Sequence, residues 1–322
     1  MLISILLARR RLIAKLLAFI SSLVLSDATS SAKTVENNTP SEPRDTAPDV
    51  SVIAKRQGDE THFLVENREL CEVTMTFQMR LVNLNSTANL PCTATFPPGK
   101  TTEAFTLSPT SPDAKWEYSY TNFYKLGSSC AVHDESAVYQ LPFAVGTKYK
   151  VTQGYNGSYS HKGSNLYAID WQMPEGTSVY AARGGIVVKV RDDSDKGGGN
   201  VKYDKFNNYV LIRHEDGTLG HYCHLKKAGV VVRPGQVVRT GQLIAHSGNT
   251  GYSSGPHLHF SVFKTKDGKD RISIPVKFRT AEDEVAVTLK EGRKYRAAST
   301  APIVVTAQKE AGTTPVQGTI GQ

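Results

Sequence analysis

The sequence Pro256-His257-Leu258-His259-Phe260 places two histidines one residue apart within a short run of otherwise apolar side chains. In a β-strand, successive side chains point to opposite faces, so His257 and His259 would share one face and Leu258 and Phe260 the other. The two histidine Cα atoms would then lie about 7 Å apart, which lets both imidazoles reach one metal ion or its bound water. Two unrelated histidines on a solvated strand give the same pattern, so other residues must decide between these interpretations.

Histidines are concentrated around this run. Six of the nine fall between His214 and His259, and His161 lies upstream, near Asp170. Catalytic zinc takes three imidazole or carboxylate ligands and keeps one position open, and histidine also transfers protons near neutral pH. The chain has this inventory, although spacing alone does not separate ligands from acid–base groups. The candidate residues are His161, Asp170, His224, His257 and His259.

Short alternating runs broken by turn residues fill most of the chain and predict a mainly β protein. Residues 51–138 are expected to form a small β-sandwich-like domain of unknown role, with Pro97-Pro98-Gly99 between strands. Residues 139–297 are expected to form a second β-rich domain, which contains the histidines. Residues 33–50 and 298–322 are polar, lack periodicity and predict a linker and a flexible tail.

The composition suits a soluble globular protein, with 39% hydrophobic and 21% charged residues. The net charge is 38 − 30 = +8, which favours anionic surroundings such as cell-wall polymers. Nucleic acid is the rival explanation of this charge. Lysine and arginine are scattered, however, without an aromatic-basic signature, so we expect no nucleic-acid partner.

Residues 1–32 have the pattern of a secretory signal peptide. Arg9-Arg10-Arg11 and Lys15 precede a short apolar run, and small residues follow it. We therefore expect an exported protein, periplasmic or secreted, with no stable membrane span after cleavage of the signal. Four cysteines agree with an oxidising compartment, and we expect a disulfide between Cys71 and Cys92.

Three further stretches make the resemblance to a known family specific. They are YAIDWQMPEGTSVYAARGGIVV (167–188), GHYCHLKKAGVVVRPGQVVRTGQLIAHSGNTG (220–251) and YSSGPHLHFSV (252–262). Over about residues 139–278 the chain resembles the LytM or lysostaphin-type zinc metalloendopeptidases, which cut peptide bonds in bacterial cell walls. The resemblance implies a groove-bearing antiparallel β-sheet domain and one Zn²⁺ per chain. It gives no role to the N-terminal domain.

The resemblance also implies a role for each candidate. His161, Asp170 and His259 would bind zinc, while His224 and His257 would orient or deprotonate the attacking water and stabilise the transition state. Many family members place the first two ligands four residues apart, whereas His161 and Asp170 are nine apart. A loop through residues 162–165 must therefore bring His161 back, and Gly163 makes such a loop feasible.

Two tyrosines just before His161, Tyr155 and Tyr159, are candidates for an oxyanion hydrogen bond, although packed or exposed loop tyrosines are the commoner case. The leading hypothesis is an exported peptidase acting on peptidoglycan stem peptides or cross-bridges. The alternative is a catalytically silent wall-binding relative that regulates another hydrolase. The stretch RPGQVVRTGQLIA also resembles the hairpin of biotinyl- or lipoyl-carrier domains, but it lacks the lysine that such domains modify.

Overall fold

The computed structural model describes residues 49–299. The predicted signal peptide and most of the predicted linker and tail lie outside this range. The described residues contain strands and only two short 3-10 helices, which confirms the prediction of a mainly β protein. Among them, no helix has the length and apolar character needed to cross a membrane.

The N-terminal domain is built from seven strands in two sheets, one with the order β1-β2-β6-β4 and the other with the order β5-β3-β7. Alternating side chains from both sheets meet in one core, where Phe63 stacks on Phe105 at a ring-centroid distance of 4.7 Å and Phe77 lies edge-on to both. The domain is thus a β-sandwich, as predicted. Its strands are β1 (Val50–Gln57), β2 (Glu60–Asn67), β3 (Val73–Val82), β4 (Leu84–Ser86), β5 (Cys92–Phe96), β6 (Lys100–Pro109) and β7 (Glu117–Leu126).

The C-terminal domain is organised around a nine-stranded sheet with the order β17-β12-β14-β15-β20-β10-β9-β23, in which β21 also pairs with β20. A three-stranded sheet, β11-β18-β16, lies outside this path. The elements are β8 (Val138–Gln140), β9 (Lys148–Gln153), η1 (Gly163–Asn165), β10 (Ile169–Gln172), β11 (Ser178–Tyr180), β12 (Gly185–Arg191), β13 (Gly197–Gly198), η2 (Val201–Phe206), β14 (Tyr209–Arg213), β15 (Leu219–Cys223), β16 (Leu225–Val230), β17 (Val237–Val238), β18 (Leu243–Ser247), β19 (Gly251–Tyr252), β20 (His257–Thr265), β21 (Arg271–Ile274), β22 (Lys277–Arg279) and β23 (Lys294–Arg296).

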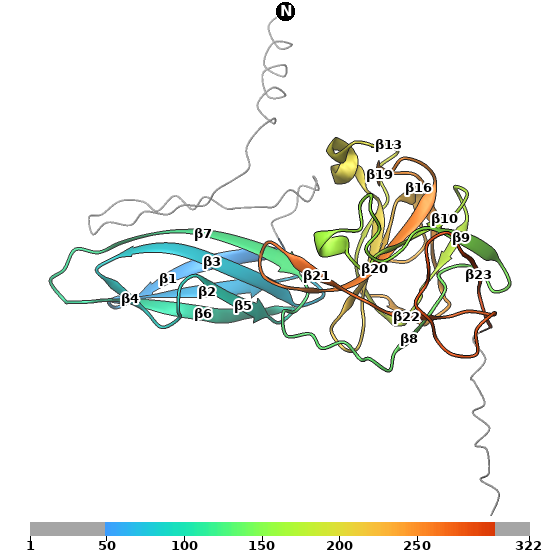
Figure 1. The fold of residues 1–322 in the computed structure, drawn as a ribbon. Coiled ribbons are helices and arrows are strands. Elements are labelled where there is room, and N and C mark those ends of the chain that lie inside the picture. Colours follow the sequence, from blue (N-terminus) through green and yellow to red (C-terminus); the bar gives the residue numbers. More distant parts are fainter. Residues whose placement is uncertain (1–48, 300–322) are drawn as a thin grey trace, which may run out of the picture.

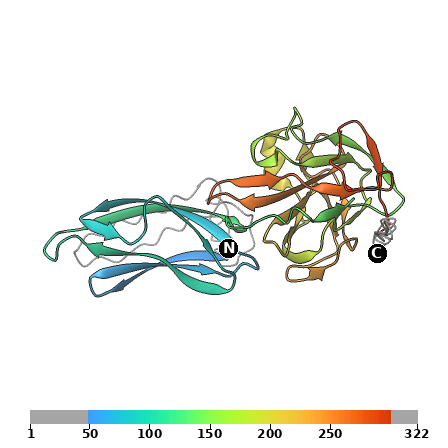
Figure 2. The ribbon, with the colours of Figure 1, turned by 60° about the horizontal axis from the view of Figure 1, so that its bottom comes forward.

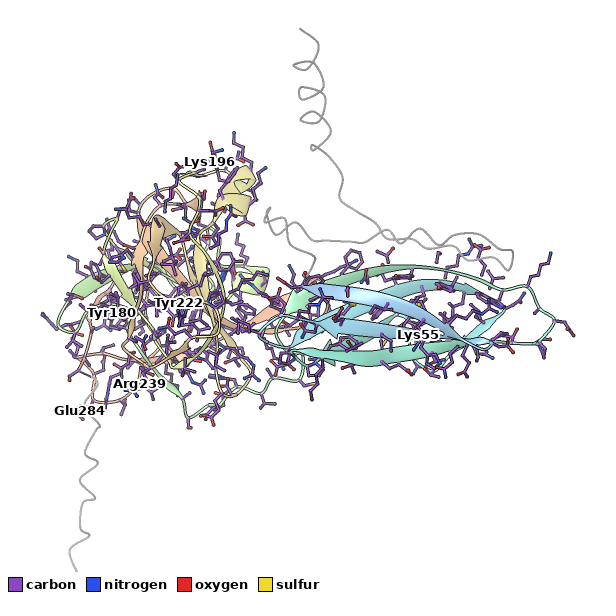
Figure 3. All side chains as sticks on the ribbon, turned by 180° about the vertical axis from the view of Figure 1, so that it is seen from behind. Lys55, Tyr180, Lys196, Tyr222, Arg239 and Glu284 are labelled. Atoms are coloured by element: carbon purple, nitrogen blue, oxygen red, sulfur yellow. The ribbon has the colours of Figure 1, made fainter. Side chains whose placement is uncertain are left out.

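Strand β20 divides its side chains between two faces, as the sequence predicts. Leu258 and Phe260 are buried in the main core with Trp171 and Tyr222, and Figure 3 shows Tyr222 inside the C-terminal domain. His257 and His259 alternate with Leu258 and Phe260 and line a cavity. The apolar face therefore fixes the strand in the core, and the histidines are held on the other face.

The two domains dock end to end in an elongated molecule, with the hairpin of β20 and β21 reaching the end of the sandwich in both views (Figures 1 and 2). The contact is a small apolar cluster of Cys71 and Leu126 with Leu219 and Phe263. Two ion pairs flank it: Glu72 receives two hydrogen bonds from Arg213, at 2.6 and 2.7 Å, and Glu69 accepts one of 2.8 Å from Lys189.

The predicted disulfide between Cys71 and Cys92 is wrong in this structure, where all four cysteines are free. Cys92 lies opposite Phe77 in β3, whereas Cys71 precedes the first residue of that strand, Val73, by two positions. Cys71 lies six positions before Phe77, the residue opposite Cys92. Six positions of extended chain span about 20 Å, while a disulfide needs Cα atoms less than about 7 Å apart. Cys71 instead packs as a buried apolar residue between the domains.

Candidate metal centre and active-site groove

Asp170 and His259 are brought together by strand register. Asp170 lies directly opposite His259 in the antiparallel pair of β10 and β20, so their side chains share a face. Oδ1 of Asp170 lies 2.9 Å from Nδ1 of His259. His259, in turn, lies opposite Cys223 of β15, so β20 is paired on both sides at this position. Sheet pairing therefore fixes two of the three predicted ligands.

His161 reaches the same point from a loop. Its Nε2 lies 3.2 Å from Oδ2 of Asp170, and the side chain is fully buried. The chain between the two residues turns through the 3-10 helix η1, and Gly163 has a φ of +55° there. This is the return loop predicted to compensate for the long spacing.

Gln153, which the sequence analysis missed, holds that loop in place. Its Oε1 accepts hydrogen bonds from the backbone N–H groups of Tyr159 and Ser160, and its Nε2 donates to Asp170 Oδ2 at 2.9 Å. His161 Nδ1 also lies 2.8 Å from the carbonyl oxygen of Gly154. One amide therefore ties the loop that carries His161 to the carboxylate that His161 faces.

The three side chains form a candidate metal centre. His161, Asp170 and His259 are each buried, and one ligand atom from each lies within 4.8 Å of the others. Because the Gly154 carbonyl can only accept, Nδ1 of His161 carries the proton when the ring is neutral and Nε2 presents its lone pair. Nε2 is a buried polar atom with no hydrogen-bond partner among the described residues, which is what a metal-ligating nitrogen without its metal would show.

The charge of the cluster also suits a cation. Burial opposes ionisation of Asp170, but the imidazoles of His161 and His259, which lie 3.2 and 2.9 Å from its oxygens, outweigh it and hold the pKa of the carboxyl well below its usual range. Asp170 is thus an ionised carboxylate inside the domain, surrounded by imidazoles. Such a donor set of two nitrogens and one carboxylate is typical of a divalent metal site.

His224 approaches the centre through an unusual backbone conformation. It follows the last residue of β15, Cys223, and has a φ of +62°, in the left-handed region that costs a non-glycine residue about 1–3 kcal/mol. Asn207 Oδ1 accepts a hydrogen bond from its backbone N–H, and Thr250 presents its carbonyl oxygen 2.7 Å from Nδ1. This turn of the backbone aims the imidazole at the metal cluster.

His224 and His257 form a pair of imidazoles beside the metal cluster, with ring centroids 4.6 Å apart. His257 Nδ1 lies 2.8 Å from the carbonyl oxygen of Gly255, so both rings use Nδ1 to donate to a carbonyl and keep Nε2 free. Burial, followed by the neighbouring His257 and His259, lowers the pKa of His224 to about 3. His224 is therefore a neutral imidazole with a free acceptor nitrogen near neutral pH.

The four residues Asp170, His224, His257 and His259 line a cavity of about 470 Å³, which we call the active-site groove. Its wall is formed by C-terminal-domain residues alone, so the N-terminal domain does not cover it. Tyr159, from a loop, and Tyr252, from β19, line the groove, and their hydroxyl groups lie 3.2 Å apart. Tyr159 is 63% exposed.

The second tyrosine candidate, Tyr155, lies elsewhere. Its hydroxyl donates to the carbonyl oxygen of Val276 and accepts from the N–H of the same residue, at 2.7 and 2.8 Å. These two bonds occupy the hydroxyl in a structural role, and Tyr155 does not line the groove. Of the two candidates, only Tyr159 is placed to meet a ligand.

Three other histidines lie apart from the metal cluster. His214 is buried with its Nδ1 2.8 Å from the Gly184 carbonyl oxygen, and His246 faces the Gly229 carbonyl oxygen at 3.2 Å. His221 contacts Cys223 and packs edge-on against Tyr209 and Phe263.

Residues 164–271 match the family described as Peptidase family M23. Over these residues the chain is similar to a Peptidase family M23 domain. The match includes Asp170, His224, His257 and His259, and it starts three residues after His161. Resemblance and geometry thus point to the same residues.

The M23 domain has named relatives. An uncharacterized metalloprotease of Buchnera aphidicola is 31% identical over 177 residues, which are 53% of this chain and 43% of the relative. The peptidoglycan DD-endopeptidase ShyA of Vibrio cholerae is 34% identical over 37% of this chain and 26% of its own length. The solved structure of the antimicrobial peptidase lysostaphin from Staphylococcus simulans is 31% identical over 39% of this chain and 47% of that one, with a TM-score of 0.30. The chain therefore spans less than half the length of these proteins.

Proposed function

We propose that this protein is an exported zinc metalloendopeptidase that hydrolyses peptide bonds in peptidoglycan stem peptides or cross-bridges. The observation that carries the proposal is the convergence of His161, Asp170 and His259 beside the imidazole pair His224 and His257. Four of these residues lie within the stretch that matches Peptidase family M23, and His161 lies three residues before it. A carboxylate and two imidazoles provide the ligands, and two further imidazoles provide proton transfer.

In this proposal His161, Asp170 and His259 hold one zinc ion. The unpartnered Nε2 of His161 and the ionised carboxylate of Asp170 support the assignment. Bound zinc supplies a Lewis acid that polarises the scissile carbonyl and lowers the pKa of a water molecule. Gln153 and the Gly154 carbonyl keep the ligands oriented by hydrogen bonds to Asp170 and His161.

His224 and His257 are assigned to proton transfer. Each has a free Nε2 at the groove, which can take a proton from the attacking water. The resulting imidazolium can then donate a hydrogen bond to the negative charge that develops on the carbonyl oxygen, and later return the proton to the leaving amine. The low pKa of His224 keeps it in the acceptor form before the reaction begins.

The substrate class is proposed from the shape and charge of the groove and from the names of the relatives. The groove joins a second hollow of about 420 Å³ through Gln172 and Pro256, and that hollow is lined by Lys148, Lys150 and Lys294. An extended, partly anionic peptide would suit such a channel. ShyA is named as a peptidoglycan endopeptidase, and the net charge of +8 fits an anionic wall.

The experiment is metal analysis of the purified protein together with hydrolysis of purified peptidoglycan, with and without a chelator. We expect about one zinc per chain, soluble peptide products, loss of activity with chelator and recovery with added Zn²⁺. His259→Ala should abolish both zinc binding and hydrolysis. A protein without zinc, whose behaviour His259→Ala leaves unchanged, would reject the enzyme and favour the silent wall-binding regulator.

A further inference from the structure

A second cavity lies between the metal centre and the N-terminal domain. This interdomain cavity has a volume of about 610 Å³. Its floor is the histidine-bearing face of the large sheet, where His221, Cys223 and Phe263 line it. Its walls come from η1, from η2 and from the end of β7, which belongs to the sandwich (Figure 1).

The interdomain cavity opens onto the active-site groove. Ser160, His224, Tyr252 and His259 line both, so a ligand can extend from one into the other without leaving the protein surface. Of the described N-terminal domain, Lys125 and Leu126 at the end of β7 line the cavity, together with His224 and His259 of the C-terminal domain. The docked domain therefore completes a compartment next to the reacting centre.

Arg271 is the central cation of this cavity. Its guanidinium lies over the ring of Phe263 at 4.5 Å, one nitrogen donates to Asn165 Oδ1 at 2.6 Å, and another lies 3.3 Å from His221 Nδ1. Within residues 49–299 it makes no ion pair with a carboxylate. The half-buried cations elsewhere do: Arg213 pairs with Glu72, Arg183 with Asp216 and Lys189 with Glu69.

Lys125 brings a second unpaired cation from the other domain. It is half-buried at the end of β7, and among the described residues its ammonium group forms neither an ion pair nor a hydrogen bond. Burial, and after it the positive charge of Arg271, lowers the pKa of Lys125, while the carboxylates of Asp270 and Asp204 oppose this shift without cancelling it. The two cations are therefore close enough to repel each other, and that repulsion raises the free energy of the empty cavity.

The remaining charges leave the cavity positive. Lys205 and Lys269 also line it, and the carboxylates there are Asp204 and Asp270, neither of which pairs with Arg271 or Lys125. Arg191 completes the lining but pairs with Asp193. Half-buried cations without an anion are costly unless a ligand supplies one, and the planar fork of arginine matches a carboxylate.

From these contacts we propose that the interdomain cavity is a carboxylate-binding subsite, in which Arg271 and Lys125 hold a free carboxylate of the peptide substrate while its scissile bond lies at the metal centre. The inference rests on the proposed function, because it names the part of the substrate that the neighbouring compartment selects. It also gives the N-terminal domain a role: that domain supplies one of the two cations that recognise the substrate.

The test compares two synthetic cross-bridged stem peptides that differ in one group, a free carboxylate or its carboxamide near the scissile bond. The full-length wild-type protein should cleave the carboxylate peptide with a kcat/KM about ten- to a hundredfold higher, as expected for hydrogen bonds to a charged group. Lys125→Met should reduce this ratio to near one. Arg271→Lys, which keeps the charge and loses the fork, should lie between the two.

The matched control is Lys115→Met, which removes the same charge from an exposed position in the N-terminal domain, before β7 rather than at its end. It should keep both the activity and the ratio of the wild type. If the wild type cleaves both peptides equally and Lys125→Met does not change their kcat/KM values, the carboxylate subsite is rejected. The proposed hydrolase activity would not be affected by that result.

A binding measurement separates the two proposals. Calorimetry with a carboxylate peptide whose scissile bond is replaced by a non-hydrolysable one should give a Kd about ten- to a hundredfold weaker in Lys125→Met. If no peptide is cleaved but this dependence is found, the subsite stands and the hydrolase is rejected. If neither cleavage nor Lys125-dependent binding is found, both are rejected.

Discussion

The two ends of one face of the nine-stranded sheet are built alike but covered differently. At one end, Asp170 of β10 and His259 of β20 point out of this face. At the other end, Leu219 of β15 and Phe263 of β20 point out of the same face. Strand alternation places both sets, because positions 259 and 263 differ by an even number of residues. The two ends differ in what packs over them: a loop lies over the polar end, and the N-terminal domain lies over the apolar end.

The two ends of the sheet also differ in how their charges are balanced. At the docking end, Glu69 and Glu72 of the sandwich meet Lys189 and Arg213, so each charge has an opposite partner. At the metal end, Asp170 meets imidazoles, which are neutral unless protonated, and the neutral amide of Gln153. A buried carboxylate surrounded by neutral nitrogen ligands lacks a cation, whereas the docking end is complete without any ligand. The comparison therefore separates a binding site from a structural contact on the same surface.

Asp170→Asn is expected to have the largest effect on the metal end. It removes the only carboxylate of the metal cluster while keeping the shape of the side chain. Loss of a supporting hydrogen bond costs about 10–100-fold in metal affinity, so loss of a ligand should exceed about 100-fold and remove hydrolysis. The loss of metal affinity is measured as the zinc content of the protein after dialysis against a weak chelator. Asp195→Asn is the control, since Asp195 pairs with the exposed Lys227; full zinc occupancy in Asp170→Asn would contradict the site.

The next effect separates metal binding from proton transfer. His224→Gln should lower kcat by about 10²–10⁴-fold, the usual contribution of a general acid or base, and keep about one zinc per chain. His246→Gln, which alters a histidine facing the Gly229 carbonyl oxygen, should leave kcat unchanged. Loss of zinc in His224→Gln would show that His224 is a ligand, and the assigned roles would have to be exchanged.

A smaller effect tests the loop that covers the polar end. Gln153→Ala removes the hydrogen bonds to Asp170 and to the backbone of Tyr159 and Ser160, so His161 and Asp170 lose their common support. We expect zinc affinity to fall about 10–100-fold, measured by competition with a chelating dye. The exposed Gln78→Ala in the sandwich is the control. Unchanged affinity in Gln153→Ala would mean that η1 alone positions His161.

Sequence patterns predicted what depends on alternation and on neighbouring residues. The two faces of β20 and the sandwich strands follow from period-two patterns and turn residues. The ligand roles of Asp170 and His259 came from the family resemblance. The resemblance then indicated which residues to pair across the domain. Gly163 was identified because a return loop needed a residue that tolerates positive φ, and its φ of +55° agrees.

Features set by three-dimensional neighbours could not be predicted in this way. His224 aims at the metal centre because its φ is positive, which no local residue preference requires. The disulfide prediction failed because it rested on the sequence interval between the two cysteines. In the structure Cys71 precedes β3, whereas Cys92 pairs with Phe77 in the middle of that strand. Gln153 gave no signal, since one amide among many is unremarkable until its partners are known. Arg271 and Lys125 come from different domains, so only docking shows that they share a cavity.

The smallest effect is expected at the docking end, where removing one charge leaves the apolar cluster intact. Hydrogen bonds from Arg213 lower the pKa of Glu72, against the opposing effect of burial. Because the folded pKa is depressed, the stabilisation is present above the unfolded pKa of about 4.3 and is lost as the pH falls through the lower folded value. Glu72→Gln should therefore lower the free energy of unfolding by about 1 kcal/mol at pH 7, a modest value because the pair is partly solvated.

Urea unfolding of wild type and Glu72→Gln at pH 7 and at pH 3 checks this linkage. The difference between the two proteins should shrink at pH 3, because this pH lies below the unfolded pKa of about 4.3 and the stabilisation from the lowered folded pKa of Glu72 is then being lost. Glu66→Gln is the matched control, because Glu66 pairs with the exposed Arg68 inside the sandwich and should give no measurable change. A difference of the same size at both pH values would show that Glu72 acts through packing, and the charge contrast between the two ends of the sheet would then not hold.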